Sequence, residues 1–414
     1  MPSTNVNLFR ANIGIYNNLL SSFFTVYAPS TLPQVQSLAL AAKQRVDVSP
    51  ITIGSAFGQK YTFEINQQLP ELEQILVNVT ISPLTYNGTY CYYAENFIQQ
   101  LLALIEYRDP ANGQIQTYTP EVLISDYRSM KITEQEHVAR QQLLGLPIAT
   151  RAGFCANGVS TTFELQSWFR ERYENTMRAQ NLDVPLLIDL TVANLGNLIN
   201  TDSTLPVTGT INMTLTYCGR IPTEAERNTT AAVINSKDGQ LMQIKDTFYQ
   251  NYLTIPAGFS GSTTIAIDAI KGPVYELDLF FRAQNDVQGS GLTPVQNEFT
   301  NFRADCKPDT IEIKSGNEFL LQNIAKIRLT RDDRRFFWGS SLPTSDLVCI
   351  TYAEFPELAC KLNSTYLDFN FLGKSQLTLF YQNQTPVAIQ VGVLARTNVF
   401  IQHQAGTIKA VTSQ

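Results

Sequence analysis

The chain contains two successive blocks of short segments in which apolar and polar residues alternate, and this pattern most constrains its fold. In residues 75–82, for example, isoleucine or valine occupies every second position. A period of two places alternate side chains on opposite faces of a strand, so one face is expected to lie on a core. A single core stops growing at roughly 250–300 residues, so the 414 residues of this chain predict two domains. We therefore expect an all-β protein made of two antiparallel sandwiches, each of about eight strands.

The candidate strands form two groups, with irregular or helical excursions between them. We expect such excursions at residues 119–148 and 168–181, and a long exposed loop at residues 284–308. Gly373 is expected to supply the positive φ of a tight hairpin. The candidate strands lie at 61–65, 75–82, 105–107, 161–169, 185–192 and 211–218 in the first block, and at 248–255, 265–267, 275–279, 311–313, 367–371, 377–381 and 387–393 in the second.

A change in composition separates the two blocks. Residues 220–238 lose the alternation and gain proline, charge and small polar residues, which is typical of a connection between domains. The predicted organisation is an N-terminal helical arm at 1–47, a first sandwich at 48–220, an interdomain connection at 221–245, a second sandwich at 246–405 and a C-terminal tail at 406–414.

The N-terminal segment has a helical period. In residues 8–27 large apolar side chains recur at steps of three or four, which places them on one face of an amphipathic helix. The run is too short and too polar to span a bilayer comfortably. Its apolar face is expected to pack on protein or to lie on a membrane, and packing on protein is the commoner outcome. The residues of this face are Phe9, Ile13, Tyr16, Leu20, Phe23 and Tyr27.

Charge is scarce, and this bears on the partners of the chain. Charged residues make up 16% of the sequence, against about 25% in an average soluble protein. Uncharged polar side chains cost less to desolvate than ions, so such a surface suits broad contact with other protein. The net charge of −6 argues against direct binding of nucleic acid, which needs a basic surface.

The residues that usually carry chemistry are few. The only histidines, His137 and His403, lie in different halves of the chain, whereas a histidine metal site or a serine triad would use more of them. The six cysteines form no C-x-x-C pair, and the start of the chain does not resemble a signal peptide, so folding in a reducing cytoplasm is expected. No phosphate-loop, dinucleotide or hydrolase motif occurs. We therefore expect no catalytic residue, no metal ligand and no cofactor.

Three pairs of acidic residues could in principle act as acid and base. Two carboxylates roughly 5–10 Å apart can hydrolyse glycosides, but each of these pairs has basic neighbours, so ion pairs or subunit contacts are favoured. The pairs are Glu134 with Glu136, Glu171 with Glu174, and Asp332 with Asp333.

Residues 328–339, RLTRDDRRFFWG, are the densest mixture of charge and aromatic side chains in the chain. Arginine and aromatic residues are typical of interface hot spots, because both supply large contact areas and directed bonds. The cluster is also compatible with a charged turn beside a sheet edge. The expected intersubunit contact consists of Arg331, Asp332, Asp333, Arg334, Arg335 and Trp338.

The order of features resembles the double-jelly-roll major capsid proteins of the tectivirus and adenovirus lineage, in particular those of tailless icosahedral viruses with an internal membrane. The stretches that carry the resemblance are NFIQQLLALIEYRDPANGQ at 96–114, DTFYQNYLTIPAG at 246–258 and RTNVFIQHQAGTI at 396–408. The resemblance implies two upright eight-stranded jelly rolls side by side, with short helices in the loops.

The same resemblance implies a mechanical function. Three subunits would form a homotrimer, a pseudo-hexagonal capsomer that tiles an icosahedral shell. The implied partners are neighbouring capsomers, the penton and minor capsid proteins, and the internal viral membrane, toward which the N-terminal helix would face. The implied location is the virion, after assembly in the host cytoplasm.

Two other classes of function remain open. A paired-sandwich protein that binds or hydrolyses glycans would have an acidic or aromatic cleft at the domain junction, with Trp168 or Trp338 beside paired carboxylates. A minor vertex or spike protein of a virion would be pentameric or would show only one barrel.

Overall fold

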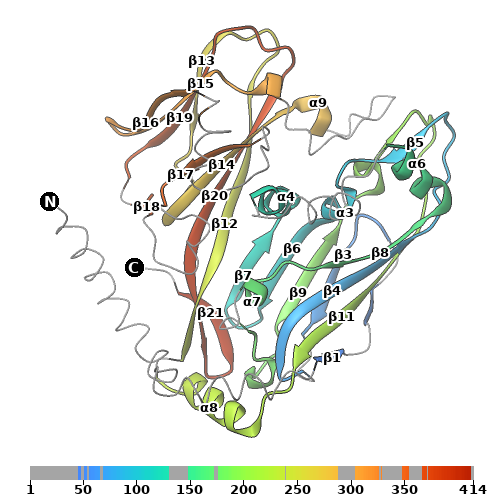
Figure 1. The fold of residues 1–414 in the computed structure, drawn as a ribbon, viewed down its shortest axis with the longest axis vertical. Coiled ribbons are helices and arrows are strands. Elements are labelled where there is room, and N and C mark those ends of the chain that lie inside the picture. Colours follow the sequence, from blue (N-terminus) through green and yellow to red (C-terminus); the bar gives the residue numbers. More distant parts are fainter. Residues whose placement is uncertain are drawn as a thin grey trace.

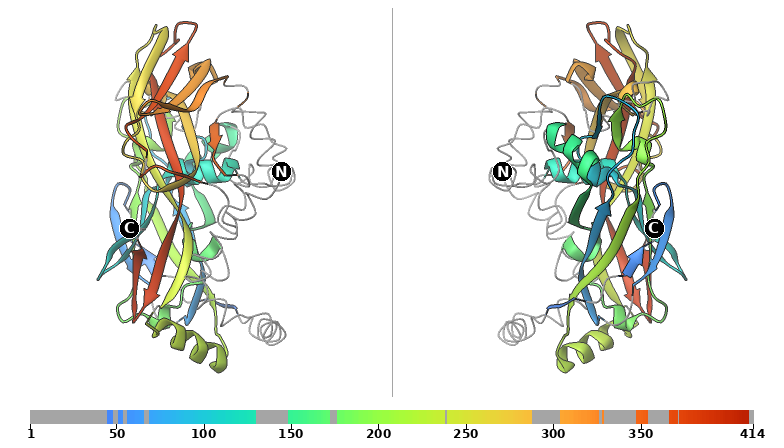
Figure 2. Two further views of the ribbon diagram at one scale, coloured as in Figure 1. Left: turned by 90° about the vertical axis from the view of Figure 1, so that its left-hand side faces the viewer. Right: turned by 90° about the vertical axis from the view of Figure 1, so that its right-hand side faces the viewer.

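The computed structural model describes residues 45–47, 51–53, 56–65, 69–129, 148–171, 176–237, 239–287, 304–325, 328, 347–353, 366–370 and 372–411. These residues form two sandwiches of antiparallel sheets (Figure 1). The strands of both run roughly along the long axis of the molecule. The long strands β12 and β20 of the second sandwich extend alongside the first sandwich (Figures 1 and 2).

The first sandwich is built from a five-stranded and a four-stranded sheet. One sheet has the order β1-β11-β4-β8, with β2 also paired to β11, and the other has the order β3-β9-β6-β7. The short strands β5 and β10 pair with each other at one end. The bounds are β1 (Arg45–Asp47), β2 (Ile51–Ile53), β3 (Lys60–Glu64), β4 (Glu71–Ile81), β5 (Cys91–Tyr93), β6 (Leu102–Asp109), β7 (Gly113–Tyr118), β8 (Val159–Glu164), β9 (Leu187–Val192), β10 (Ile199–Thr201) and β11 (Ile211–Arg220).

The second sandwich has the orders β12-β20-β14-β17 and β13-β19-β15-β16. In addition, β18 pairs with β14 and β21 pairs with β20. The bounds are β12 (Gln240–Ile255), β13 (Gly261–Ala266), β14 (Pro273–Ala283), β15 (Thr310–Ser315), β16 (Glu318–Ala325), β17 (Val348–Thr351), β18 (Leu367–Asp368), β19 (Ser375–Tyr381), β20 (Ile389–Gln404) and β21 (Thr407–Val411).

The two sandwiches share one topology. With β1 and β2 counted as one strand and β5 and β10 set aside, the sheets of the first sandwich run first-eighth-third-sixth and second-seventh-fourth-fifth in chain order. With β18 and β21 set aside, the second sandwich has the same order. This is the eight-stranded jelly roll. The predicted fold class, two antiparallel jelly rolls, is confirmed.

The helices are short and lie in connections between strands, as expected. Within the described ranges, none of them is long and apolar enough to cross a membrane. The helix α8 begins at a capping box formed by Thr223 and Glu226. The bounds are α3 (Phe97–Gln100), α4 (Pro120–Ser129), α6 (Ile148–Asn157), α7 (Trp168–Glu171), α8 (Glu224–Ile234) and α9 (Gln284–Val287), with 3-10 turns η3 (Ala179–Asn181), η4 (Leu195–Asn197) and η5 (Ala304–Cys306).

The predicted connection at 221–245 contains α8 and the first residues of β12, and the predicted boundaries between domains stay a prediction. The hairpin predicted at Gly373 is wrong. The preceding strand, β18, pairs with β14, whereas β19 lies in the other sheet between β13 and β15. The chain therefore crosses from one sheet to the other at this point, and Gly373 does not have a positive φ.

The period-two pattern explains the cores. On β4, Ile75, Val77, Val79 and Ile81 are each at most 1% exposed. The core of the first jelly roll also continues into the second, because Met242, Ile244, Phe280, Leu394, Ile401 and Ile408 belong to the same cluster of buried apolar residues. A separate core lies between the two sheets of the second jelly roll.

Candidate functional site

The junction between the two jelly rolls is the most elaborate group of polar side chains among the described residues. The strand β14 is buried on both faces. One face carries Leu277, Leu279 and Phe281 into the core of the second jelly roll. The other face points toward the first jelly roll and carries Glu276, Asp278, Phe280 and Arg282, none of them more than 1% exposed.

The helix α4 of the first jelly roll supplies one half of a buried network at this face. Its Ser125 hydroxyl donates to the Asp278 carboxylate at 2.6 Å and accepts from the Arg396 guanidinium at 2.6 Å. Arg396 Nε lies 3.1 Å from Asp278 and 3.4 Å from Glu276. The network joins α4 to β14 and β20, so it connects the two jelly rolls through charged groups removed from water.

A second network lies one turn earlier on α4. Arg282 Nη2 lies 3.5 Å from the Glu121 carboxylate. The same nitrogen donates to Tyr249 Oη at 3.1 Å, to Asn251 Oδ1 at 2.9 Å and to Gln390 Oε1 at 3.0 Å. Burial raises the pKa of the Tyr249 hydroxyl, which therefore stays neutral. Glu121 and Arg282 thus form a buried ion pair whose arginine is held by three neutral oxygens.

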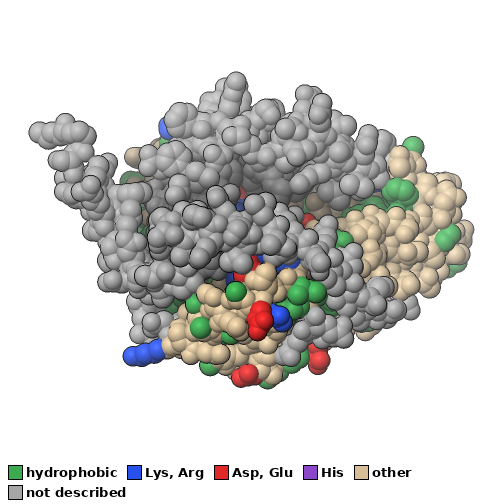
Figure 3. Space-filling view, turned by 60° about the horizontal axis from the view of Figure 1, so that its bottom comes forward, with side chains coloured by type: hydrophobic (Ala, Val, Ile, Leu, Met, Phe, Trp, Pro, Cys, Tyr) green, Lys and Arg blue, Asp and Glu red, His purple; other side chains and the backbone are tan. Residues whose placement is uncertain are grey.

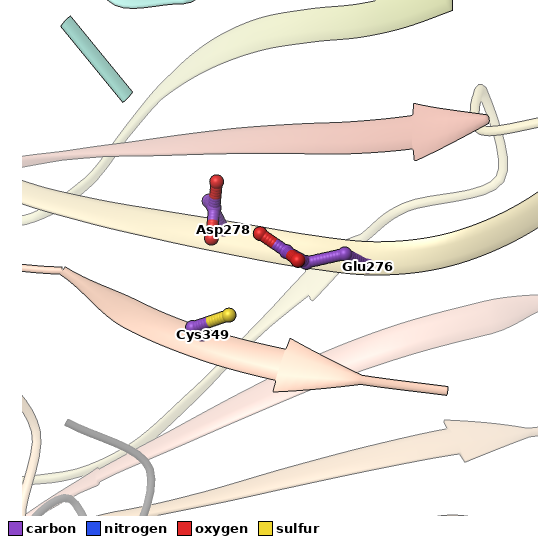
Figure 4. Close-up of side chains that lie close together, drawn as sticks. All are labelled: Glu276, Asp278 and Cys349. Carbon is purple, nitrogen blue, oxygen red and sulfur yellow. The ribbon is translucent and has the colours of Figure 1, made fainter. Parts of the chain in front are cut away.

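Figure 4 shows Glu276, Asp278 and Cys349 close together on the neighbouring strands β14 and β17. Their oxygen and sulfur atoms lie within 4.8 Å of one another. The Arg396 guanidinium already stands against both carboxylates. We therefore interpret the carboxylates as counter-charges of this arginine.

The C-terminal strands close the junction at its other end. The Ile408 amide of β21 donates to Asp109 Oδ2 at 2.7 Å, and Asn112 Nδ2 donates to the Ile408 carbonyl at 3.2 Å. The Asp183 amide donates to the Gly406 carbonyl at 2.9 Å. Gly406 has a φ of 77°, and a Cβ there would lie 2.2 Å from the Asp183 side chain, so this position favours glycine.

A third ionic group lies at the base of the first jelly roll. Glu71 of β4 is paired with Arg220 of β11, and its other oxygen lies 3.6 Å from Arg178 Nε. Arg178 also donates to Gln240 Oε1 at 3.0 Å. Because Gln240 is the first residue of β12, this group fixes the start of the second jelly roll to the first.

His403 of β20 is buried beside this group, with 1% of its surface exposed. Burial lowers the pKa of the imidazole to about 4, and the positive charge of Arg178 adds to this effect. A hydrogen bond to the Asn181 backbone and the charge of Asp109 act in the opposite direction. The ring is therefore neutral at pH 7 in the folded chain.

The arrangement counts against the glycan-acting alternative. The carboxylates at the junction are buried and paired with arginine, so they do not line an open cleft. Trp168 is 0% exposed and packs against Tyr107 in the first core, with ring centroids 5.0 Å apart. The presence of two jelly rolls also excludes the single-barrel form of the vertex-protein alternative.

The residues selected from the sequence do not take part in this junction as far as it is described. The apolar face from Phe9 to Tyr27 and the cluster from Arg331 to Trp338 lie outside the described residues. The acidic pairs at 134 and 136 and at 332 and 333 lie outside them too, as does Glu174, and the side chain of Glu171 is not described. Both sets of contact residues stay predictions.

Sequence reasoning missed the junction residues themselves. The alternation in residues 275–279 predicts a strand with one face exposed to solvent, whereas both faces are buried. A signal was available, because Glu276, Asp278 and Arg282 alternate with large apolar residues on one strand of a chain that has little charge.

On the face shown in Figure 3, the charged side chains of the described surface are scattered.

These features define the protein as two jelly rolls joined into one body by a buried polar junction. No protein-family profile matches the sequence, and no curated protein matches it. Solved structures do match: PBCV-1 VP54 has a TM-score of 0.71 at 12% identity, over 90% of this chain and 97% of that one. The Faustovirus major capsid protein has a TM-score of 0.62 at 9% identity, over 87% and 90%.

The STIV major capsid protein has a TM-score of 0.52 at 11% identity, over 86% of this chain and 96% of that one. The chain therefore has the double jelly-roll fold of viral major capsid proteins, and the resemblance predicted from the sequence is confirmed at the level of the fold.

Replacing Arg396 by Met is expected to reduce the free energy of unfolding by about 3–5 kcal/mol, because Glu276 and Asp278 stay buried without that counter-charge. Urea unfolding followed by circular dichroism measures the loss. Adding Glu276→Gln and Asp278→Asn to Arg396→Met should restore much of the stability. A loss below about 1 kcal/mol in the single variant would show that the pairing of Arg396 with these carboxylates does not stabilise the chain.

Acid is expected to weaken the junction through His403. The unfolded imidazole titrates near pH 6.5 and the folded one near pH 4, so between these values the unfolded chain binds the proton and stability falls as the pH falls. Between pH 7 and pH 5 this amounts to about 2 kcal/mol. His403→Asn should show a smaller loss of stability over this interval in urea melts at both pH values. Equal losses in the two proteins would contradict the assignment.

Proposed function

We propose that this chain is the major capsid protein of an icosahedral virus and acts as a structural building block, not as an enzyme. The observation that carries the proposal is the fold: two jelly rolls with one topology, joined by a buried polar junction. The named neighbours are capsid proteins, and one matching structure is described as a PBCV-1 virus capsid. The proposed partners are further copies of the chain and other capsid components, in a virion assembled in the host cytoplasm over an internal membrane.

The joint inside the chain gives a template for a joint between chains. In the chain, the β6–β7 edge of the first jelly roll lies against β12 and β21 of the second, next to the sheet face covered by α4. Because the two jelly rolls have the same topology, the second one has an equivalent edge, β15–β16, and the first has an equivalent sheet face, β11-β4-β8.

The equivalent face on the first jelly roll is uncharged at its centre. The Asn78 side chain donates to Thr214 and Thr216 and accepts from Thr162, at 3.3, 3.1 and 2.7 Å. Thr80 and Ser160 lie 3.3 Å apart beside them and are exposed. A flat face of this kind costs little to desolvate when another subunit covers it.

The equivalent edge on the second jelly roll carries apolar side chains. Among the described strands, β16 pairs only with β15. Phe319 on β16 is 47% exposed, and Leu320, Leu321 and Ile324 are only partly buried. An exposed apolar edge of this kind is a site for contact with another chain.

If the β15–β16 edge of one chain packs on the β11-β4-β8 face of the next, the interface is heterologous. Such an interface closes into a ring when the rotation between copies is a simple fraction of a turn. A rotation of about 60° between successive jelly rolls would close three chains into a ring of six barrels. The proposed capsomer is therefore a homotrimer with a pseudo-hexagonal outline.

The purified chain is expected to be a trimer in solution. Multi-angle light scattering should give three times the chain mass of 46.3 kDa, about 139 kDa. A protein that stays at 46.3 kDa even at high concentration would contradict the trimeric capsomer.

Phe319→Asp is expected to dissociate the trimer, because a carboxylate would have to be desolvated in the proposed interface. A cost above about 1.4 kcal/mol corresponds to a tenfold weaker association. Sedimentation velocity over a concentration series measures the change, and circular dichroism verifies the fold. The matched control is Leu205→Asp, because Leu205 is 60% exposed at the end of the first jelly roll. If both variants stay trimeric, β16 is not at the interface.

A further inference from the structure

The strand β5 and the helix α6 lie side by side at one end of the first jelly roll (Figure 1), and they carry Cys91 and Cys155. Cys91 is the first residue of β5 and pairs with Thr201 of β10. Cys155 lies in the last turn of α6. Both are free thiols, 2% and 0% exposed respectively.

Contacts on both sides of the two cysteines fix α6 against β5. Arg151 Nη1 donates to the Tyr93 carbonyl at 2.7 Å. The Leu84 amide donates to the Cys155 carbonyl at 2.8 Å. These two hydrogen bonds hold α6 beside β5 and beside the segment that follows β4.

Aromatic packing supports the same placement. The Tyr93 and Phe97 rings stack with centroids 4.3 Å apart, and Phe154 packs on Phe97 with centroids 6.4 Å apart. Phe154 and Tyr93 are close neighbours in sequence of the two cysteines, so these rings hold the cysteines near each other.

The side chains of Cys91 and Cys155 interact with each other. This interaction lowers the pKa of Cys91, which also interacts with the Thr201 hydroxyl, and it raises the pKa of Cys155. Cys91 is therefore the more readily ionised of the two thiols. In a thiol pair the thiolate is the nucleophile.

We propose that Cys91 and Cys155 are a disulfide-forming pair, reduced while the chain folds in the cytoplasm and oxidised by a low-molecular-weight disulfide after the particle leaves the cell. The stage at which oxidation occurs rests on the proposed capsid function. The formation of the bond needs only the folded chain.

The reaction is a double thiol–disulfide exchange. The Cys91 thiolate attacks one sulfur of the small disulfide, forms a mixed disulfide and releases one small thiolate, which takes up the proton lost by Cys91. Cys155 then loses its proton and attacks the Cys91 sulfur, and the second small thiolate leaves and is protonated. The protein loses two electrons and two protons, and one disulfide becomes two thiols. Because both sulfurs are buried, the first attack requires a local opening of α6.

The bond would close the loop from residue 91 to residue 155, which contains β6, β7 and α4. These are the elements through which the first jelly roll contacts the second. A cross-link over a loop of this length restricts the unfolded chain more than the folded one. Oxidation would therefore stabilise the part of the first jelly roll that supports the junction, at the stage when the particle is outside the cell.

The test uses the purified full-length chain, reduced and then incubated with oxidised glutathione. Alkylation, proteolysis and mass spectrometry are expected to find the peptide of Cys91 cross-linked to that of Cys155. The melting temperature should rise by about 5 °C and return on addition of reductant. Cys155→Ser should show neither change, whereas Cys306→Ser, which removes a buried thiol of the second jelly roll, should show both.

The wild-type peptide map decides the matter even if a variant fails to fold. If Cys91 and Cys155 remain as alkylatable as Cys306 after oxidation, or carry glutathione without a cross-link between them, the proposal is wrong. A cross-link found in a chain that is monomeric by light scattering would support the disulfide and contradict the trimeric capsomer, so the two proposals can fail separately.

Discussion

The arrangement of this protein depends on the double burial of β14. One face of the strand belongs to an ordinary sandwich core. The other face carries two carboxylates, one phenylalanine and one arginine into the contact with the first jelly roll. Removing such charges from water is costly unless each meets a counter-charge in good geometry. Arg396 pairs with both carboxylates from within the second jelly roll, whereas Ser125 and Glu121 of α4 bond to Asp278 and Arg282 from the first. The contacts of α4 therefore favour one relative position of the two jelly rolls, because another would leave Arg282 without its carboxylate partner Glu121.

The apolar side of the junction acts together with the charges. Phe280 and Leu394 leave the second jelly roll and join the core of the first, as do Ile401 and Ile408 near the C-terminus. Apolar contact is strong but non-directional, and it fixes a distance better than an orientation. The ion pairs add the orientation. Long strands then spread the joint over much of the molecule, because β12 and β20 pair over most of their length and continue along the first jelly roll (Figure 1).

The sequence predicted the fold class because the period of two is a local property that any half-buried strand must obey. Ile75, Val77 and Val79 could be assigned to a core without knowledge of their neighbours. The junction could not be predicted in this way. Asp278 follows the same period as a solvent-facing residue, and only the position of α4, far away in the sequence, decides that it is buried. The wrong hairpin at Gly373 has the same origin, because most consecutive strands of a jelly roll belong to different sheets, and turn chemistry alone does not reveal this.

The sheet face of β14 contains ion pairs, whereas the equivalent face of the first jelly roll is uncharged at its centre. In the proposed capsomer, this contrast follows from the stage at which each face is covered. The face of β14 is covered as the chain folds and never needs to be solvated again, so it can contain ion pairs. In the proposed capsomer, the equivalent face around Asn78 would have to be stable in water before another copy arrives, and it would then have to lose that water. Hydroxyl and amide groups satisfied by one another, as Asn78 and Thr162 are, meet both conditions, whereas buried carboxylates would make each assembly step costly. The low charge of the chain is the property expected if the fold repeats one joint twice, once within the subunit and once, in the proposed capsomer, between subunits.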